Sequence, residues 1–121
     1  GRAPRSEYWW FVLFEFLALI VASTLFVSIE ALGDGLSVAL LIITVLALVL
    51  PHLAVTVRRL HDIDVSGWWV GLLWLIAVFA SSSDAAPFVN FLLTIVLLIA
   101  TLLPGNKGHN RFGDDPRDSN R

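Results

Sequence analysis

The chain of 121 residues lacks cysteine and methionine, and each of these absences has a consequence. It contains no cysteine, which excludes disulfides, a thiolate nucleophile and a cysteine-ligated metal. It contains no methionine, so we expect the natural start to lie before Gly1. Charged residues are also scarce, at 15%, against about 25% in an average soluble domain. Hydrophobic residues make up 57% and the mean hydropathy is +0.80, which indicates a protein surrounded by lipid.

Lysine and arginine are absent from four long apolar stretches. These stretches are residues 8–29, 36–57, 66–82 and 87–103. All eight Lys and Arg residues precede the first stretch, separate the second from the third, or follow the fourth. The charged residues of the two other connections are all acidic: Glu30, Asp34 and Asp84. Because short cytoplasmic loops carry the Lys/Arg excess, this pattern predicts four spans with both termini in the cytoplasm.

The predicted fold is an all-α, four-helix transmembrane bundle that forms a single domain over residues 1–121. The first two stretches are roughly 33 Å long as helices, enough for a hydrocarbon core of about 30 Å. The third, Trp68 to Ala80 without its flanks, is only roughly 20 Å long, and the fourth is also slightly short. Whether the third stretch crosses fully is left open, because it needs flanking residues or a thinner bilayer. Residues 104–121 are expected to form a cytoplasmic tail.

Tryptophan positions support this topology independently of charge. Trp9, Trp10, Trp68 and Trp69 all fall at predicted cytoplasmic ends of spans. Tryptophan is enriched at the headgroup level of a bilayer, where its ring anchors a helix. We interpret these four residues as anchors.

Two ionisable residues, Glu15 and His52, lie inside predicted spans. Glu15 is about 7–8 Å, and His52 about 9 Å, from the same predicted interface, so antiparallel neighbours would place them at one level. The sequence therefore predicts a hydrogen bond between them. This pair would act as a polar clamp between helices, or alternatively as a proton-handling pair.

Residues 58–64 form the densest charged run. Three interpretations remain open: a solvated loop with topology-setting arginines, an anion or headgroup site, and a metal site. The metal site would use His61, Asp62, Asp64 and His109. If the second helix continued into this run, Arg58 and Asp62 would face each other, four residues apart. Ser66 or Asp64 is expected to cap the third helix.

Residues 104–113 are rich in glycine and contain one lysine, but they are not a phosphate-binding P-loop. The glycine spacing and the Ser or Thr after the lysine are absent. We expect a structured turn that folds back under the helices, with Phe112 at the membrane interface.

Three motifs together resemble the DUF805 family of small bacterial inner-membrane proteins. They are residues 1–10 (GRAPRSEYWW), residues 58–62 (RRLHD) with 66–69 (SGWW), and Pro104-Gly105 with residues 110–113 (NRFG) and Asp115-Pro116. The match spans nearly the whole chain, although Phe112 stands where the family often has tyrosine. The resemblance implies a location in the bacterial inner membrane, and it carries over no biochemical activity.

All three motifs map to the predicted cytoplasmic side, so their polar residues are expected to meet in one cluster. The candidate members are Arg5, Glu7, Arg58, Arg59, His61, Asp62, Asn110 and Arg111. This cluster would lock the helices together or bind a phosphate or lipid headgroup. We assign no catalytic residue, cofactor or metal.

The sequence favours a non-enzymatic membrane protein that acts by interaction. Its expected partners are the lipid bilayer, including anionic lipid, a second copy, or another membrane protein, and not nucleic acid. The alternatives are a transporter or channel subunit that uses Glu15 and His52, and an anionic headgroup-binding protein.

Overall fold

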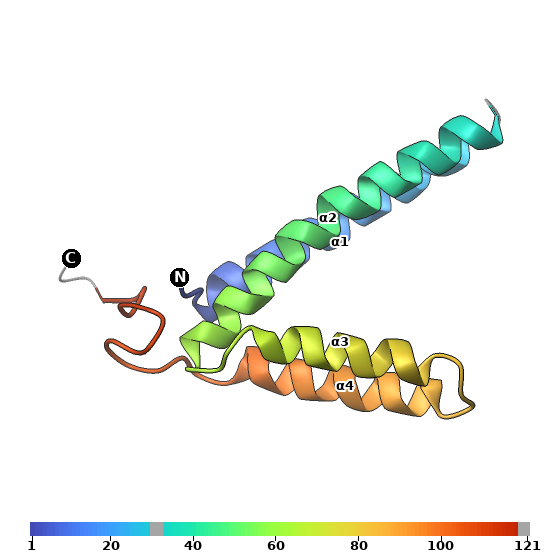
Figure 1. Ribbon diagram of the computed structural model, residues 1–121. Helices are drawn as coiled ribbons and strands as arrows, with labels where there is room; N and C mark the ends of the chain where they lie inside the picture. The colour runs from blue at the N-terminus through green and yellow to red at the C-terminus, as the bar shows by residue number, and fades with distance from the viewer. Residues whose placement is uncertain (30–32, 119–121) are drawn as a thin grey trace. The chain divides into compact units, whose positions relative to one another are not determined.

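The computed structural model describes residues 1–29 and 33–118, and the side chain of residue 34 is not described. Within these residues the chain forms four α-helices and no strand (Figure 1). The helices are α1 (Arg5–Ile29), α2 (Asp34–Asp62), α3 (Trp68–Ala80) and α4 (Ala86–Leu102). The all-α prediction is confirmed. The chain divides into two compact units, and each is described by itself.

The hairpin unit (Trp9–Val55) contains most of α1 and α2, which run side by side in opposite directions (Figure 1). Both helices are long and apolar enough to cross a membrane, with mean hydropathies of 2.4 and 2.7. Most of their large apolar side chains are exposed. The glycines at positions 33 and 35 predict a tight turn over residues 31–35, part of which lies outside the described residues.

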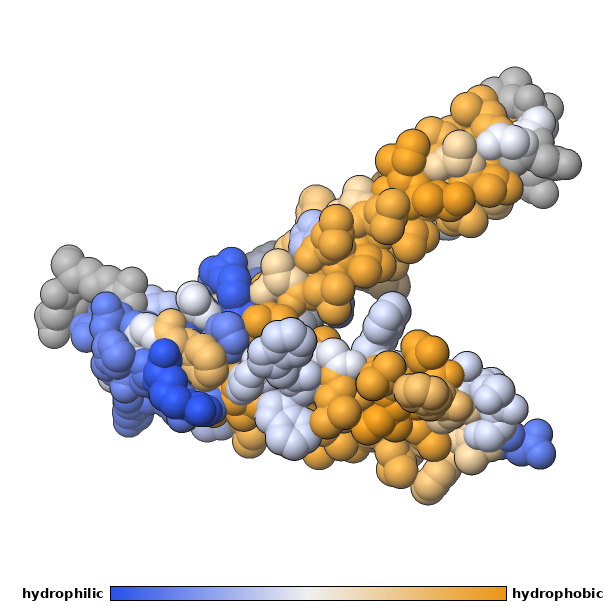
Figure 2. All heavy atoms as spheres, in the orientation of Figure 1, coloured by the Kyte–Doolittle hydropathy of each residue, from blue (hydrophilic) through white to orange (hydrophobic). Residues whose placement is uncertain are grey.

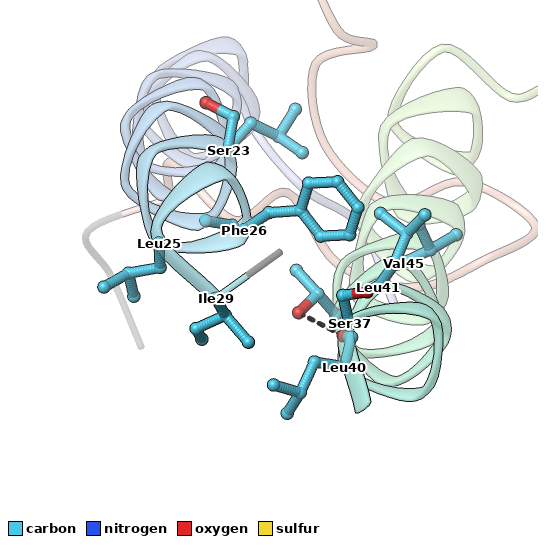
Figure 3. Close-up of a pocket in the computed structure, with 11 residues that line it drawn as sticks. Ser23, Leu25, Phe26, Ile29, Ser37, Leu40, Leu41 and Val45 are labelled. Carbon is cyan, nitrogen blue, oxygen red and sulfur yellow. Dashed lines mark hydrogen bonds between the residues drawn. The ribbon is translucent and has the colours of Figure 1, made fainter. Parts of the chain in front are cut away.

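A hollow of about 310 Å³ lies between α1 and α2 in this unit. The ring of Phe26 on α1 points toward Leu41 and Val45 on α2 (Figure 3). Ser37 also lines the hollow, but its hydroxyl donates to the Gly33 carbonyl 3.2 Å away. The hollow is therefore an apolar space between two helices.

The terminal unit consists of Gly1–Tyr8 together with the chain from Thr56 onward. Its helices α3 and α4 form a second antiparallel pair (Figure 1). They contain 13 and 17 residues, so both are short, as the sequence predicted. Hydrophilic side chains gather where α2 ends and the C-terminal segment folds, whereas the helices are largely apolar (Figure 2).

Helix α2 continues five residues beyond its predicted end at residue 57 and includes Arg58 to Asp62. It then stops at a left-handed residue, Asp64, which has φ 59°. The Asp64 amide donates to the His61 carbonyl and the Val65 amide donates to the Leu60 carbonyl. This is the Schellman arrangement, which satisfies the last carbonyls of a helix. The polar run is therefore a helix end rather than a loop.

The start of α3 packs tightly against α2 through Gly67. A Cβ atom at Gly67 would lie 2.5 Å from Cγ1 of Val57, closer than packed atoms approach. One turn further along, a Cβ at Gly71 would meet nothing within 4 Å. The two glycines therefore play different roles, although they are only four residues apart.

We predict that Gly67→Ala lowers the midpoint of thermal unfolding in detergent, because its methyl group must displace Val57. Overpacking of this kind costs about 1–3 kcal/mol. The matched variant Gly71→Ala should be neutral or stabilise by about 0.4–1 kcal/mol, since it only restricts the unfolded chain. Circular dichroism melts of both variants check this, and equal midpoints would contradict it.

Candidate functional site

Asp62, the last residue of α2, is the centre of a buried charged cluster. Its Oδ1 accepts a hydrogen bond from Arg2 Nε at 3.1 Å, and its Oδ2 accepts one from Arg59 Nη1 at 2.5 Å. All three side chains are at most 1% exposed. Buried charges persist in proteins when they are paired and hydrogen-bonded, and these three satisfy that condition. We call Arg2, Arg59 and Asp62 the Asp62 cluster.

Arginine side chains from outside α4 also satisfy the carbonyls at its end. The last carbonyls of any helix lack partners within it, and the last turn of α4 contains no basic residue. Arg59 supplies the missing donors: its Nε donates to the Thr101 carbonyl at 3.1 Å and its Nη2 donates to the Leu103 carbonyl. Arg5 donates to the Leu102 carbonyl at 3.4 Å. The end of α4 is thus capped by other segments of the chain.

Arg2 fixes the segment that follows α4. Its Nη1 donates to the carbonyls of Gly108, at 2.6 Å, and Gly113, at 3.1 Å. Its Nη2 donates to the Asn106 carbonyl at 2.5 Å. One N-terminal side chain therefore holds both the end of α2 and the C-terminal segment, which folds back as the sequence predicted.

Gly105 allows this segment to approach the cluster. A Cβ atom at Gly105 would lie 1.8 Å from Oδ2 of Asp62, so a larger residue cannot occupy this position. The neighbouring Asn106 amide donates to the Asp62 carbonyl at 2.7 Å.

The surroundings shift the pKa values of three groups in this unit. Burial lowers the pKa of Arg59, although the nearby Asp62 carboxylate opposes the shift. The hydrogen bond from the Arg117 side chain holds the pKa of Asp115 well below its usual range. The same contact raises the pKa of Arg117. Arg117 also donates to the Gly105 and Asn106 carbonyls, at 3.1 and 3.0 Å, and so reinforces the fold of the tail.

More exposed contacts surround the Asp62 cluster. Arg58 pairs with Glu7 at 2.6 Å, and Arg111 pairs with Asp64 at 3.1 Å. His61 Nδ1 lies 3.0 Å from the Gly1 carbonyl, which can only accept, so this nitrogen carries the proton. The imidazole ring stacks on Phe112 with ring centroids 3.9 Å apart.

All eight residues of the predicted cluster lie in the terminal unit, but their contacts differ from the expected ones. Arg58 pairs with Glu7, whereas Asp62 pairs with Arg59 and Arg2, so the predicted contact between Arg58 and Asp62 is wrong. Asn110 donates to the His61 carbonyl at 2.8 Å. That this cluster binds a ligand stays a prediction.

The expected helix cap is also wrong. The N-cap of α3 is Gly67, which makes no side-chain cap bond. Asp64 instead occupies the left-handed position that ends α2, and its carboxylate accepts from Arg111. Ser66 contributes a weaker contact, since its hydroxyl accepts from the Trp68 amide at 3.4 Å.

The sequence analysis missed Arg2 and the pair of Asp115 and Arg117. Arg2 lies in a short N-terminal arm, where a basic residue is typical of a topology signal. Its place in the first DUF805-like motif was the signal that marked it. Among the residues described, no group of three His, Asp or Glu side chains could hold a metal ion, so the alternative metal set is not assembled.

Glu15 and His52 meet within the hairpin unit. His52 Nδ1 lies 2.6 Å from Oε2 of Glu15, so the predicted hydrogen bond is present. The Glu15 side chain is 16% exposed and that of His52 is 40% exposed. The pair joins α1 to α2 within an otherwise apolar surface.

Comparisons with known proteins identify the family that the three sequence motifs resemble. The model of the family "Protein of unknown function (DUF805)" matches residues 1–114. This chain belongs to the DUF805 family. The Asp62 cluster, with Arg2, Arg59 and Gly105, lies entirely within the matched residues.

Relatives from Escherichia coli (strain K12) match over nearly the whole chain. Inner membrane protein YhaH is 38% identical over 120 residues, which cover 97% of this chain and 85% of YhaH. Inner membrane protein YhaI is 37% identical over 118 residues, which cover 97% of this chain and 84% of YhaI. Uncharacterized protein YiiR is 28% identical over 129 residues, which cover 98% of this chain and 85% of YiiR. No solved structure matches the chain.

We predict that Asp62→Asn strongly destabilises the protein, because it leaves two buried guanidinium groups without a counter-charge. Breaking a buried pair in this way costs about 3–5 kcal/mol. Denaturant or thermal unfolding in detergent measures the effect.

Glu7→Gln is the matched control, since it removes a carboxylate from an ion pair that is nearly half exposed. Exposed pairs contribute about 0–1 kcal/mol, so this variant should unfold close to the parent. Equal losses in the two variants would contradict the central role of Asp62.

Proposed function

We propose that this chain is a four-span protein of the bacterial inner membrane, with both termini in the cytoplasm, that acts by interaction rather than catalysis. The relatives YhaH and YhaI, both inner membrane proteins of Escherichia coli, support the location. The placement of all Lys and Arg residues on one side of the four apolar stretches supports the orientation. Helices α1 and α2 have the required length and hydropathy.

Helices α3 and α4 would cross as a short pair. At about 1.5 Å per residue they are roughly 20 and 26 Å long, against a hydrocarbon core of about 30 Å. A bilayer that thins locally, together with Ser81 at one end and Trp68 at the other, accommodates the difference. Trp9, Trp10, Trp68 and Trp69 would then lie at the cytoplasmic headgroup level.

The observation that carries the interaction proposal is how the Asp62 cluster uses its polar atoms. Among the described residues, every buried side-chain nitrogen and oxygen has a hydrogen-bond partner. Asp62 is held by two arginines, and Arg2 and Arg59 donate to six backbone carbonyls. These hydrogen bonds favour a structural role for the Asp62 cluster, in which it joins the N-terminal arm, α2, α4 and the tail. Lipid gives helices no hydrophobic reason to associate, so such a lock has clear value in a small membrane protein.

The surface left for function is then the apolar outside of the helices. Long stretches of α1 and α2 expose leucine, valine and isoleucine side chains. We propose lipid, a second copy or another membrane protein as the occupants of this surface. Nucleic acid is not proposed as a partner, because the net charge is −2.

A transporter or channel subunit is the second candidate, and the Glu15–His52 pair is the observation that favours it. A short hydrogen bond between a carboxylate and an imidazole suits proton handling, but it suits a helix clamp equally well. The two readings predict different behaviour of the same variant.

Reporter fusions test the topology. We predict that a reporter at the C-terminus is active only in its cytoplasmic form, whereas one inserted at residues 82–84 is active only in its exported form. The short loop between α3 and α4 makes this second insertion site practical. A C-terminal reporter outside the cytoplasm would overturn the orientation and the location of the Asp62 cluster.

Glu15→Gln separates the clamp from the transporter. An amide retains a hydrogen bond to His52 but cannot take up a proton. Because a clamp carries no protons in the parent either, we predict that the variant leaves the proton leak of proteoliposomes unchanged. The parent should show the same low leak as empty liposomes. A flux in the parent that is lost in a well-folded Glu15→Gln variant would establish the transporter reading instead.

A further inference from the structure

A cleft of about 370 Å³ opens in the terminal unit where α2 ends and α3 begins. Its walls come from three segments that lie apart in the sequence. The residues that line it are Val57, His61, Ser66, Gly67, Trp68, Gly71 and Phe112. Its volume falls at the lower end of the range of small-molecule sites, about 300–1,000 Å³.

Two glycines at the start of α3, Gly67 and Gly71, shape this cleft. At Gly67 the backbone of α3 comes so close to Val57 that no Cβ fits. At Gly71 the nearest atoms lie beyond 4 Å from the position of a Cβ, so α3 leaves open space here. A larger residue at position 71 would therefore fill the cleft without displacing any neighbour, so substitution of Gly71 tests the cleft directly.

One end of the cleft is polar. His61 uses Nδ1 toward the Gly1 carbonyl, so its other ring nitrogen is not part of that bond. The Ser66 hydroxyl accepts from the Trp68 amide and keeps its own proton for donation. Arg111 lies over the Phe112 ring, 5.3 Å from its centroid. It binds Asp64 through Nε and Nη2, and Nη1 takes no part in either bond.

The other end is apolar and follows α3. Val57 and Gly71 line it, and Trp68, which is 86% exposed, stands beside them. In the proposed topology Trp68 marks the headgroup level, so the cleft runs from the headgroup region into the hydrocarbon. Its polar and apolar ends thus have the order in which a lipid presents a phosphate and an acyl chain.

We propose that this cleft binds one glycerophospholipid with a net anionic headgroup. Its phosphate lies at the polar end, where the Ser66 hydroxyl can donate to it and Arg111, which contacts the lining residue Phe112, supplies positive charge. The start of an acyl chain lies along Gly71. A phosphate favours a guanidinium donor, and basic pockets on the cytoplasmic side of helices suit anionic headgroups. The inference rests on the proposed membrane topology and gives the lipid interaction a defined position.

Native mass spectrometry of the full chain in detergent tests the site, with phosphatidylglycerol or phosphatidylethanolamine added. We expect the parent to keep one phosphatidylglycerol adduct in preference to phosphatidylethanolamine, whose ammonium group offsets the phosphate charge. Gly71→Leu fills the cleft and should keep about tenfold less adduct. Gly35→Leu is the matched control, because a Cβ there also meets nothing within 4 Å, and it should bind as the parent does.

A second pair of variants tests the polar end. Arg111→Gln should remove the preference for phosphatidylglycerol, whereas Lys107→Gln, an exposed cation of the same segment, should leave it intact. Equal adducts in the parent, Gly71→Leu and Gly35→Leu would overturn the site, and so would equal retention of the two lipids by the parent. If the reporters give the predicted topology but the variants keep equal adducts, this inference alone is refuted. If the C-terminal reporter lies outside the cytoplasm, the proposed function on which it rests is refuted.

Discussion

The terminal unit depends on one constraint: the carbonyl groups at the end of α4 need donors that α4 itself does not contain. Arg59 on α2 and Arg5 at the start of α1 supply them. Asp62 supplies the negative charge that allows Arg59, and with it Arg2, to be buried. Each arginine would be costly to bury alone, and each carbonyl would be costly to leave unpaired. Together they join segments that are up to 111 residues apart in the sequence.

This constraint explains several features that would otherwise be unrelated. Gly105 is small because the chain passes directly over the Asp62 carboxylate. Helix α2 extends beyond its apolar part because Arg59 and Asp62 must lie one turn apart on the same helix. Asp64 then adopts a left-handed conformation so that the chain can turn toward α3. The hairpin unit is joined differently, by the Glu15–His52 hydrogen bond among apolar side chains.

The sequence predicted the helices well because their signals are local. Apolar length located all four, and the depth of two polar residues in neighbouring helices predicted the Glu15–His52 bond. The ion pairs within the polar cluster were less predictable, because the sequence does not show which of several nearby arginines pairs with Asp62. Sequence spacing favoured Arg58, whereas the direction of each side chain from α2 selects Arg59 for the interior and leaves Arg58 to Glu7. Arg2 escaped notice because, apart from Asp62, its partners are three backbone carbonyls, which have no sequence signature.

Solvent exchange of the arginine Nε protons, measured by ¹⁵N NMR in micelles, tests the central claim most directly. Arg2 donates its Nε proton to Asp62 and Arg59 donates its own to the Thr101 carbonyl, both buried. The Arg58 side chain, in contrast, is 46% exposed. The account predicts slow exchange for Arg2 and Arg59, with the Arg58 Nε proton exchanging much faster in the same sample. Equally fast exchange at all three arginines would mean that the Asp62 cluster is open to water, and would contradict the account.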